Sequence, residues 1–240
     1  MQEKDYEYGA SIYYSLNCQS SNEPAEISNI DNCLRVYDCI FSRNLITNFG
    51  GAICISITNY EPSKPIEIVK CQFRENKGFF AIAGSTIEGH GGAICYILNK
   101  TSVSDNNSPS LYIHNCVFTS NYAYIEGGSI FISVQNAQSS RSIEIYNCTY
   151  NYDESIFILT DPPLTINGGF ISYLIESSSE SPSNNNPPLH INNCSFSSNI
   201  DRFNYAEHIE KGGCIYIDVK NSQQLGTIEI NDCYFSHIIN

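Results

Sequence analysis

Hydrophobic and polar residues alternate along this chain in short stretches that recur in two kinds of block. The first block reads IxIxxCxFxxN, with Leu or Val36 at some Ile positions and Tyr150 at one Phe position, and the copies that begin at Ile143 and Ile228 lack the final Asn. Its six copies begin at Leu34, Ile66, Leu111, Ile143, Leu189 and Ile228. Alternation with a period of two predicts β-strands rather than turns of helix.

The second block reads GGxIxI and alternates with the first along the chain. Its copies begin at Gly50, Gly91, Gly127, Gly168 and Gly212, and Gly9-Ala-Ser-Ile12 is a degenerate further copy. Successive glycine pairs lie 41, 36, 41 and 44 residues apart. Two linked signatures at this spacing indicate a repeat protein.

Three details of the blocks predict local geometry. The inward phase of the first block slips by one residue before its Cys, which predicts a bulge or a corner. The glycine pair directly before the second strand predicts a sharp bend, or a close backbone approach that leaves no room for a Cβ. The Asn three residues after Phe is typical of a turn, where it can cap the turn and adopt a left-handed conformation.

One repeat of this kind is too small to bury its own apolar face, whereas stacked copies bury a continuous one. The blocks therefore predict an all-β fold, a right-handed single-stranded parallel β-helix (a pectin-lyase-like solenoid) of about six rungs. We expect one domain over residues 1–240. Its first rung, residues 9–44, is degenerate, and its last, residues 212–240, stops inside a repeat. This favours a piece of a longer protein, with self-association at uncapped ends.

Stacking also predicts a column of thiols inside the solenoid. The column consists of Cys39, Cys71, Cys116, Cys148, Cys194 and Cys233. Buried Cys behaves as a small hydrophobic residue. Disulfides between rungs are the alternative, although strand spacing makes their geometry strained. Cys18 and Cys33 lie outside the column and are the better disulfide candidates.

Polar insertions of variable length follow the second block in every rung, at residues 59–65, 99–110, 135–142, 176–188 and 220–226. They are rich in Ser, Asn and Pro, and variation at a loop costs little stability. The insertions 99–110 and 176–188 are the longest, so we expect them to contact an extracellular protein or glycan ligand.

The composition excludes several classes of function. Twelve Lys plus Arg against 25 Asp plus Glu give a net charge of -13, which argues against nucleic-acid binding and against an anchor on anionic lipid. No apolar stretch is long enough for a transmembrane helix, and residues 1–14 have no apolar core of a signal peptide. We therefore expect no direct insertion of this segment into a membrane.

No catalytic constellation stands out in the sequence. The outward positions before the column cysteines are Asp38, Lys70, Asn115, Asn147, Asn193 and Asp232, and no two neighbours form a carboxylate pair. The histidines occupy different rung positions: His90, His114, His190, His208 and His237. His90 and His208 come closest to aligning, without a consistent Asp. We expect no enzyme activity, catalytic residue, cofactor or metal site. An acid and a histidine meeting in one groove would instead favour a carbohydrate-active protein.

The paired signatures resemble a known family. The GGAI sequences at residues 50–53 and 91–94, together with FxxN at 41–44, 73–76, 118–121 and 196–199, resemble the polymorphic outer-membrane protein repeat of chlamydiae. Related repeats occur in expanded surface families of protists. The resemblance implies a surface-exposed or extracellular β-helix that acts as a non-catalytic adhesin in contact with host cells. A β-helix that binds or cleaves a polysaccharide is the alternative.

Overall fold

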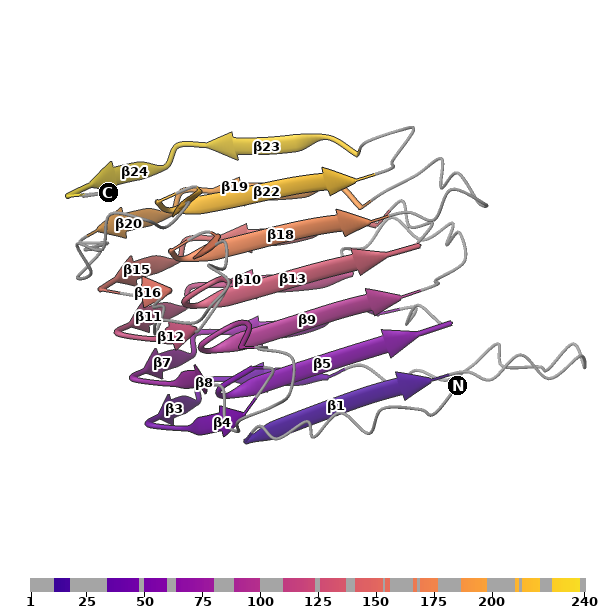
Figure 1. Cartoon of the computed structure of the whole chain (residues 1–240), viewed down its shortest axis with the longest axis horizontal. Helices are drawn as coiled ribbons and strands as arrows, with labels where there is room; N and C mark the ends of the chain where they lie inside the picture. Colours follow the sequence, from indigo (N-terminus) through magenta and orange to yellow (C-terminus); the bar gives the residue numbers. More distant parts are fainter. Residues whose placement is uncertain are drawn as a thin grey trace, which may run out of the picture.

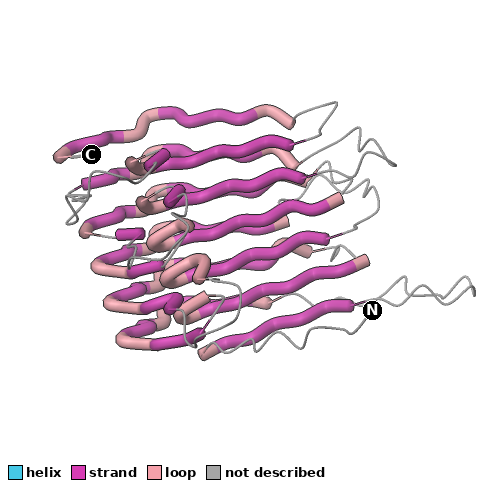
Figure 2. The backbone as a smooth tube through the Cα atoms, viewed as in Figure 1, coloured by secondary structure: helices cyan, strands magenta, loops and turns pink. Residues whose placement is uncertain are grey.

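The structure is a computed structural model built almost entirely of strands and corners. It describes residues 11–17, 34–47, 50–59, 64–79, 89–99, 110–123, 126–136, 141–152, 154–155, 166–167, 169–176, 187–197, 210–211, 213–220 and 226–237. In these ranges the backbone is strand, turn or loop, with no helix (Figure 2). Every strand pair is parallel.

Sheet A, which has the longest strands, is made of the GGxIxI strands. Its order is β1 (Ile12–Asn17), β5 (Ile53–Thr58), β9 (Ile94–Asn99), β13 (Ile130–Gln135), β18 (Ile171–Glu176) and β22 (Ile215–Lys220). Strands that are far apart in the sequence thus lie side by side in the sheet (Figure 1). The degenerate copy at Gly9–Ile12 leads into β1, in which Ile12 pairs with Ile53.

The IxIxxCxF block forms two strands, each in its own sheet. Sheet B contains β2 (Arg35–Tyr37), β6 (Ile66–Val69), β10 (Leu111–His114), β14 (Ile143–Tyr146), β19 (Leu189–Asn192) and β23 (Ile228–Asn231). Sheet C contains β3 (Ile40–Ser42), β7 (Gln72–Arg74), β11 (Val117–Thr119), β15 (Thr149–Asn151), β20 (Ser195–Ser197) and β24 (Tyr234–Ser236).

Two smaller sheets complete the coil. Sheet D contains β4 (Leu45–Thr47), β8 (Lys77–Phe79), β12 (Tyr122–Ala123) and β16 (Glu154–Ser155), and β17 (Ile166–Asn167) pairs with β21 (Glu210–Lys211). Each full rung runs through sheets B, C and A and pairs with the next rung in register. The fold is the predicted right-handed parallel β-helix of about six rungs.

The phase slip in the first block is a corner between sheets B and C. The residue before each column cysteine has a positive φ, from 51° at Asn193 to 55° at Lys70 and Asn115. One left-handed residue turns the chain so that the next strand again directs its apolar side chain inward. Asn and Asp tolerate this conformation best, which explains why they occupy five of these six positions, with Lys70 the exception.

The glycine pairs that begin at Gly50, Gly91 and Gly127 bend the chain as predicted. The first glycine has a φ of 65° at Gly50 and Gly91 and 63° at Gly127. The second approaches the next rung closely. A Cβ on Gly92 would lie 2.1 Å from the carbonyl oxygen of Gly128 and 2.4 Å from the nitrogen of Tyr122. A real Cβ has no room there.

Inward side chains form continuous columns through the solenoid. Phe41, Phe73, Phe118, Tyr150, Phe196 and Phe235 stack ring on ring, with centroids 4.7–5.1 Å apart and planes within 9° of parallel. Aliphatic residues of sheets A and B surround this stack and are almost all fully buried between the ends. Burial of such a side chain contributes about 1.5–3 kcal/mol, so each column adds stabilisation from every rung that it crosses.

The thiol column is confirmed, and its members are free. Cys71, Cys116, Cys148 and Cys194 are at most 2% exposed, whereas Cys39 and Cys233 at the two ends are half-buried. Cys148 Sγ lies 3.3 Å from the carbonyl oxygen of Tyr146 and 3.8 Å from that of Ile113 in the preceding rung. Burial raises the pKa of Cys148 well above its usual value, so this thiol stays protonated and donates. The alternative of disulfides between these rungs is wrong for the described cysteines; Cys18 and Cys33 lie outside the described residues.

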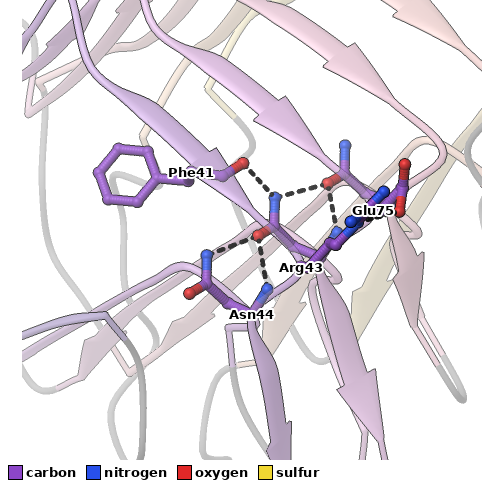
Figure 3. Close-up of polar contacts among 6 residues, drawn as sticks. Phe41, Arg43, Asn44 and Glu75 are labelled. Carbon is purple, nitrogen blue, oxygen red and sulfur yellow. Dashed lines mark hydrogen bonds and ion pairs between the residues drawn. The ribbon is translucent and has the colours of Figure 1, made fainter.

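The Asn of FxxN differs from its predicted role. The left-handed residue is the one before it, at Arg43, Glu75 and Ser120, with φ of 58°, 53° and 54°. The side chains of Asn44, Asn76 and Asn121 instead point inward and join successive rungs, whereas Asn199 lies outside the described residues. Figure 3 shows this network around Phe41 and Asn44, beside the exposed ion pair of Arg43 with Glu75 at 2.8 Å. Each buried amide here finds its partners in the neighbouring rungs.

Candidate functional site

The outer face of sheet A carries a groove of about 500 Å³ that crosses several rungs. Alternate residues of the strands point outward, and the parallel register places them in rows across the sheet. One row, at the middle of the strands, is Ser56, Ile97, Ser133, Leu174 and Asp218. A second row, at the strand ends, is Thr58, Asn99, Gln135, Glu176 and Lys220. Both rows line the groove.

An apolar cluster lies beside these rows, also on the outer face. Cys54 and Cys95 are completely buried and Phe131 is 4% exposed, with Ile97 and Leu174 packed against them. Burial is the main cause that raises the pKa of Cys95 well above its usual value. The outer face of sheet A therefore combines a buried apolar cluster with a polar groove. The apolar cluster is unusual, because outward positions of a solenoid are ordinarily polar.

A histidine and a carboxylate meet at the groove. His90 Nδ1 lies 3.2 Å from Glu126 Oε2, and their side chains are 16% and 9% exposed. The His90 ring also lies 4.5 Å from the ring of Phe131. All three residues line the groove.

This meeting follows from the repeat. His90 and Glu126 each directly precede a glycine pair, and their backbones form a parallel bridge. The near-alignment of His90 with His208 in the sequence did not predict the pairing of His90 with Glu126. His208 lies outside the described residues. The sequence does contain a signal for this pairing, at the position directly before each glycine pair. The residues at that position are Phe49, His90, Glu126, Asn167 and Lys211. In the described rungs the stack brings His90 onto Glu126 and pairs Asn167 with Lys211.

The other end of the groove is acidic. The Asp218 carboxylate lies 3.4 Å from Lys220 Nζ. Burial raises the pKa of Tyr216 to about 12, together with a hydrogen bond to Asp218 and the negative charges of Asp218 and Glu126. Glu176 adds a further carboxylate that is exposed to solvent. The groove thus carries three carboxylates against one lysine and one histidine.

The other histidines that the structure describes do not join this groove. His114 and His190 lie on the outer face of sheet B, where the His114 ring is 5.3 Å from Tyr112 and 5.4 Å from Tyr146. His237 follows β24 with a φ of 53°. Within the described ranges no three His, Cys, Asp or Glu side chains are grouped as metal ligands would be.

The predicted contact loops lie almost wholly outside the described residues. Their points of departure from sheet A are described, and they are groove residues. Insertion 99–110 begins at Asn99, the last residue of β9, and insertion 176–188 begins at Glu176, the last residue of β18. Both insertions therefore start at the groove.

The fold and its columns define a parallel β-helix repeat protein. Residues 38–56 match the Chlamydia polymorphic membrane protein (Chlamydia_PMP) repeat. The match runs from the Asp38 corner through β3 and β4 into β5, so it contains one FxxN and one GGAI sequence. The chain is a repeat protein similar to that family, and the match supports a surface location in general.

Two further comparisons complete this picture. Neither a curated protein nor a solved structure matches the chain. Among the residues that the structure describes, no helix has the length and apolar character needed to cross a membrane.

Proposed function

We propose that the chain is a non-catalytic, adhesin-like module that contacts host cells or extracellular ligands from a cell surface. The observation that carries the proposal is the repeat match at residues 38–56, which relates the chain to a family of membrane proteins. The fold supports it, because a rigid solenoid holds variable insertions at one end of sheet A without disturbing the buried columns.

The contact surface that we propose is the groove with its two neighbouring insertions, 99–110 and 176–188. These insertions vary in length and sequence without altering the core, and recognition residues often lie on such loops. The net charge of -13 means that a basic partner would associate faster at low salt.

Attachment of the purified chain to cultured cell layers tests this proposal. Thr58→Arg places a long cation in the groove, and Thr119→Arg makes the same change on sheet C as a matched control. We expect wild type and Thr119→Arg to attach, and Thr58→Arg or a variant with both insertions cut to the length of 135–142 to attach less. Equal attachment of all variants would contradict the assigned contact surface, and no attachment by wild type would contradict the adhesin function itself.

A second candidate is a carbohydrate-active β-helix that cleaves a polysaccharide. The His90–Glu126 pair favours it, since a positioned acid and a histidine in one groove can exchange protons with a substrate. Release of new reducing ends from polysaccharides measures it. Cleavage that is lost in Glu126→Gln and kept in Glu144→Gln, a control on β14, would replace the non-catalytic proposal.

A further inference from the structure

The groove presents outward side chains of differing type at a regular spacing along the axis of the solenoid. Its two rows draw one residue from each of β5, β9, β13, β18 and β22. Neighbouring strands of a sheet lie about 4.8 Å apart. A ligand that runs along the axis therefore meets equivalent positions at this interval, which is close to the length of one sugar ring in an extended chain.

The contacts suit a ring with an apolar face and hydroxyl groups at its edge. Ile97 and Leu174 give the groove an apolar floor, backed by the buried cluster of Cys54, Cys95 and Phe131. Ser56 and Ser133 alternate with these two residues in one row, and further neutral hydrogen-bonding groups, Thr58, Asn99 and Gln135, flank the floor in the neighbouring row. A sugar ring uses both kinds of surface together.

One of these flanking groups has an unused acceptor. Asn99 Oδ1 is buried, and it has no hydrogen-bond partner in the described part of the chain. Gln135, beside it in the same row, donates from Nε2 to Ser133 Oγ at 3.3 Å, which leaves its carbonyl oxygen to accept from a ligand. A buried acceptor without a donor is costly, and a ligand hydroxyl would satisfy it.

Charge restricts the ligand further. Glu126, Glu176 and Asp218 all line the groove, and its one lysine, Lys220, is already paired with Asp218. Polyanionic chains, such as uronic acid polymers and sulfated glycans, would meet these carboxylates without a free cation to balance them. A neutral chain avoids that cost.

The backbone of sheet A argues against an extended peptide in this groove. Peptides that bind to sheets add at an edge, where main-chain groups are unpaired. The groove lies on a face, and β5, β9, β13 and β18 each already pair on both sides. Only side chains are offered to the ligand, as suits a partner that binds through hydroxyl groups.

We propose that this groove binds a neutral glycan chain that lies along the solenoid axis, with successive sugars on successive rungs. This rests on the proposed surface function and names its ligand class. Binding is extended over several rungs, so affinity rises with chain length up to the number of rungs that the groove spans.

Calorimetric titration with defined oligosaccharides tests the inference. The probes are neutral hexamers of β-1,4-linked glucose and of N-acetylglucosamine, their dimers, and a galacturonic acid hexamer. We expect a neutral hexamer to bind, its dimer to bind more weakly, and the galacturonic acid hexamer not to bind. The double variant Asn99→Ala/Gln135→Ala should weaken binding of the hexamer by about tenfold or more, as expected for two lost hydrogen bonds. Gln72→Ala on β7 is the matched control and should bind like wild type.

Three results would overturn the inference. They are the absence of binding by either neutral hexamer, equal binding of the galacturonic acid hexamer, and unchanged affinity in a double variant that unfolds at the same temperature as wild type. Cell attachment separates this failure from failure of the proposed function. Wild type that attaches to cells but binds no neutral hexamer would retain the adhesin function with a different ligand.

Discussion

Asn76 donates a hydrogen bond from its side-chain Nδ2 to Asn121 Oδ1 at 2.9 Å, although the two residues are 45 positions apart in the chain. The same Asn76 amide donates to the carbonyl oxygen of Phe41 at 3.1 Å. Its own Oδ1 accepts from Nδ2 of Asn44 at 2.7 Å and from the Asn44 backbone nitrogen at 3.2 Å. One fully buried side chain thus links three rungs and uses its whole hydrogen-bonding capacity.

Replacement of this side chain should be costly. We predict that Asn76→Ala lowers the free energy of unfolding by about 2–4 kcal/mol, because backbone and amide groups in two neighbouring rungs lose buried partners. Asn231→Ala, at an exposed position of β23, is the control and should cost less than about 0.5 kcal/mol. Chemical denaturation measures both. Equal stability of the two variants would show that the hydrogen bonds of Asn76 contribute nothing to stability.

The glycines should differ sharply in their tolerance of alanine. Gly92→Ala brings a Cβ to within 2.1 Å of the Gly128 carbonyl oxygen, so we predict that the variant does not form the native stack. Gly78→Ala is the matched change. A Cβ on Gly78 would lie 3.3 Å from its nearest neighbour, the His90 carbonyl oxygen, and Gly78 does not have a positive φ. We expect this second variant to fold, with a cost of about 1 kcal/mol or less. Circular dichroism and thermal unfolding distinguish them.

Stability should fall at alkaline pH through buried thiols. Burial raises the pKa of Cys214 to about 11, against about 8.5 for a thiol in an unfolded chain. Between these values the unfolded chain releases a proton that the folded chain keeps, so the stabilisation present below pH 8.5 is lost as pH rises toward 11. The slope for this one thiol is at most about 1.4 kcal/mol per pH unit.

Cys214→Ala provides the comparison for that pH dependence. Its stability should decline less steeply than that of wild type between about pH 8.5 and 11. Urea denaturation at a series of pH values gives the slopes. Parallel curves for the two proteins would contradict the assignment of this titration to Cys214.

The end of the stack formed by β22, β23 and β24 should promote self-association. Ile230 and Phe235 belong to inward columns, yet they are 41% and 46% exposed because no described rung covers them. Edge strands offer unpaired backbone groups to another copy. We predict concentration-dependent association of the 240-residue chain, reduced in Ile230→Lys. Tyr146→Lys, an exposed change in the middle of the stack, should leave association unchanged. Monodisperse monomer at high concentration by light scattering would refute this.

Much of the fold was predictable because the same sequence pattern, and therefore the same local geometry, recurs in each copy of the repeat. The period-two pattern of Ile53 and Ile55 predicted strands, and recurrence of the same pattern predicted that they stack in register. The column of Cys39 to Cys233 followed from that register alone. The αL corners were visible only as a phase slip, because Lys70 shows that residue type does not dictate the conformation.

By itself, the sequence determined the β-helix, its inward columns and its glycine bends, because each depends on spacing that recurs from rung to rung. Only the tertiary structure decided that Asn76 points inward. An Asn that caps a turn and an Asn that bonds to neighbouring rungs would both lie three residues after Phe, so the spacing does not distinguish them. The tertiary structure alone brought His90 onto Glu126, which are 36 residues apart and chemically unlike. Columns of identical residues reveal themselves in a repeat, whereas a site made of different residues from different rungs appears only once the rungs are stacked.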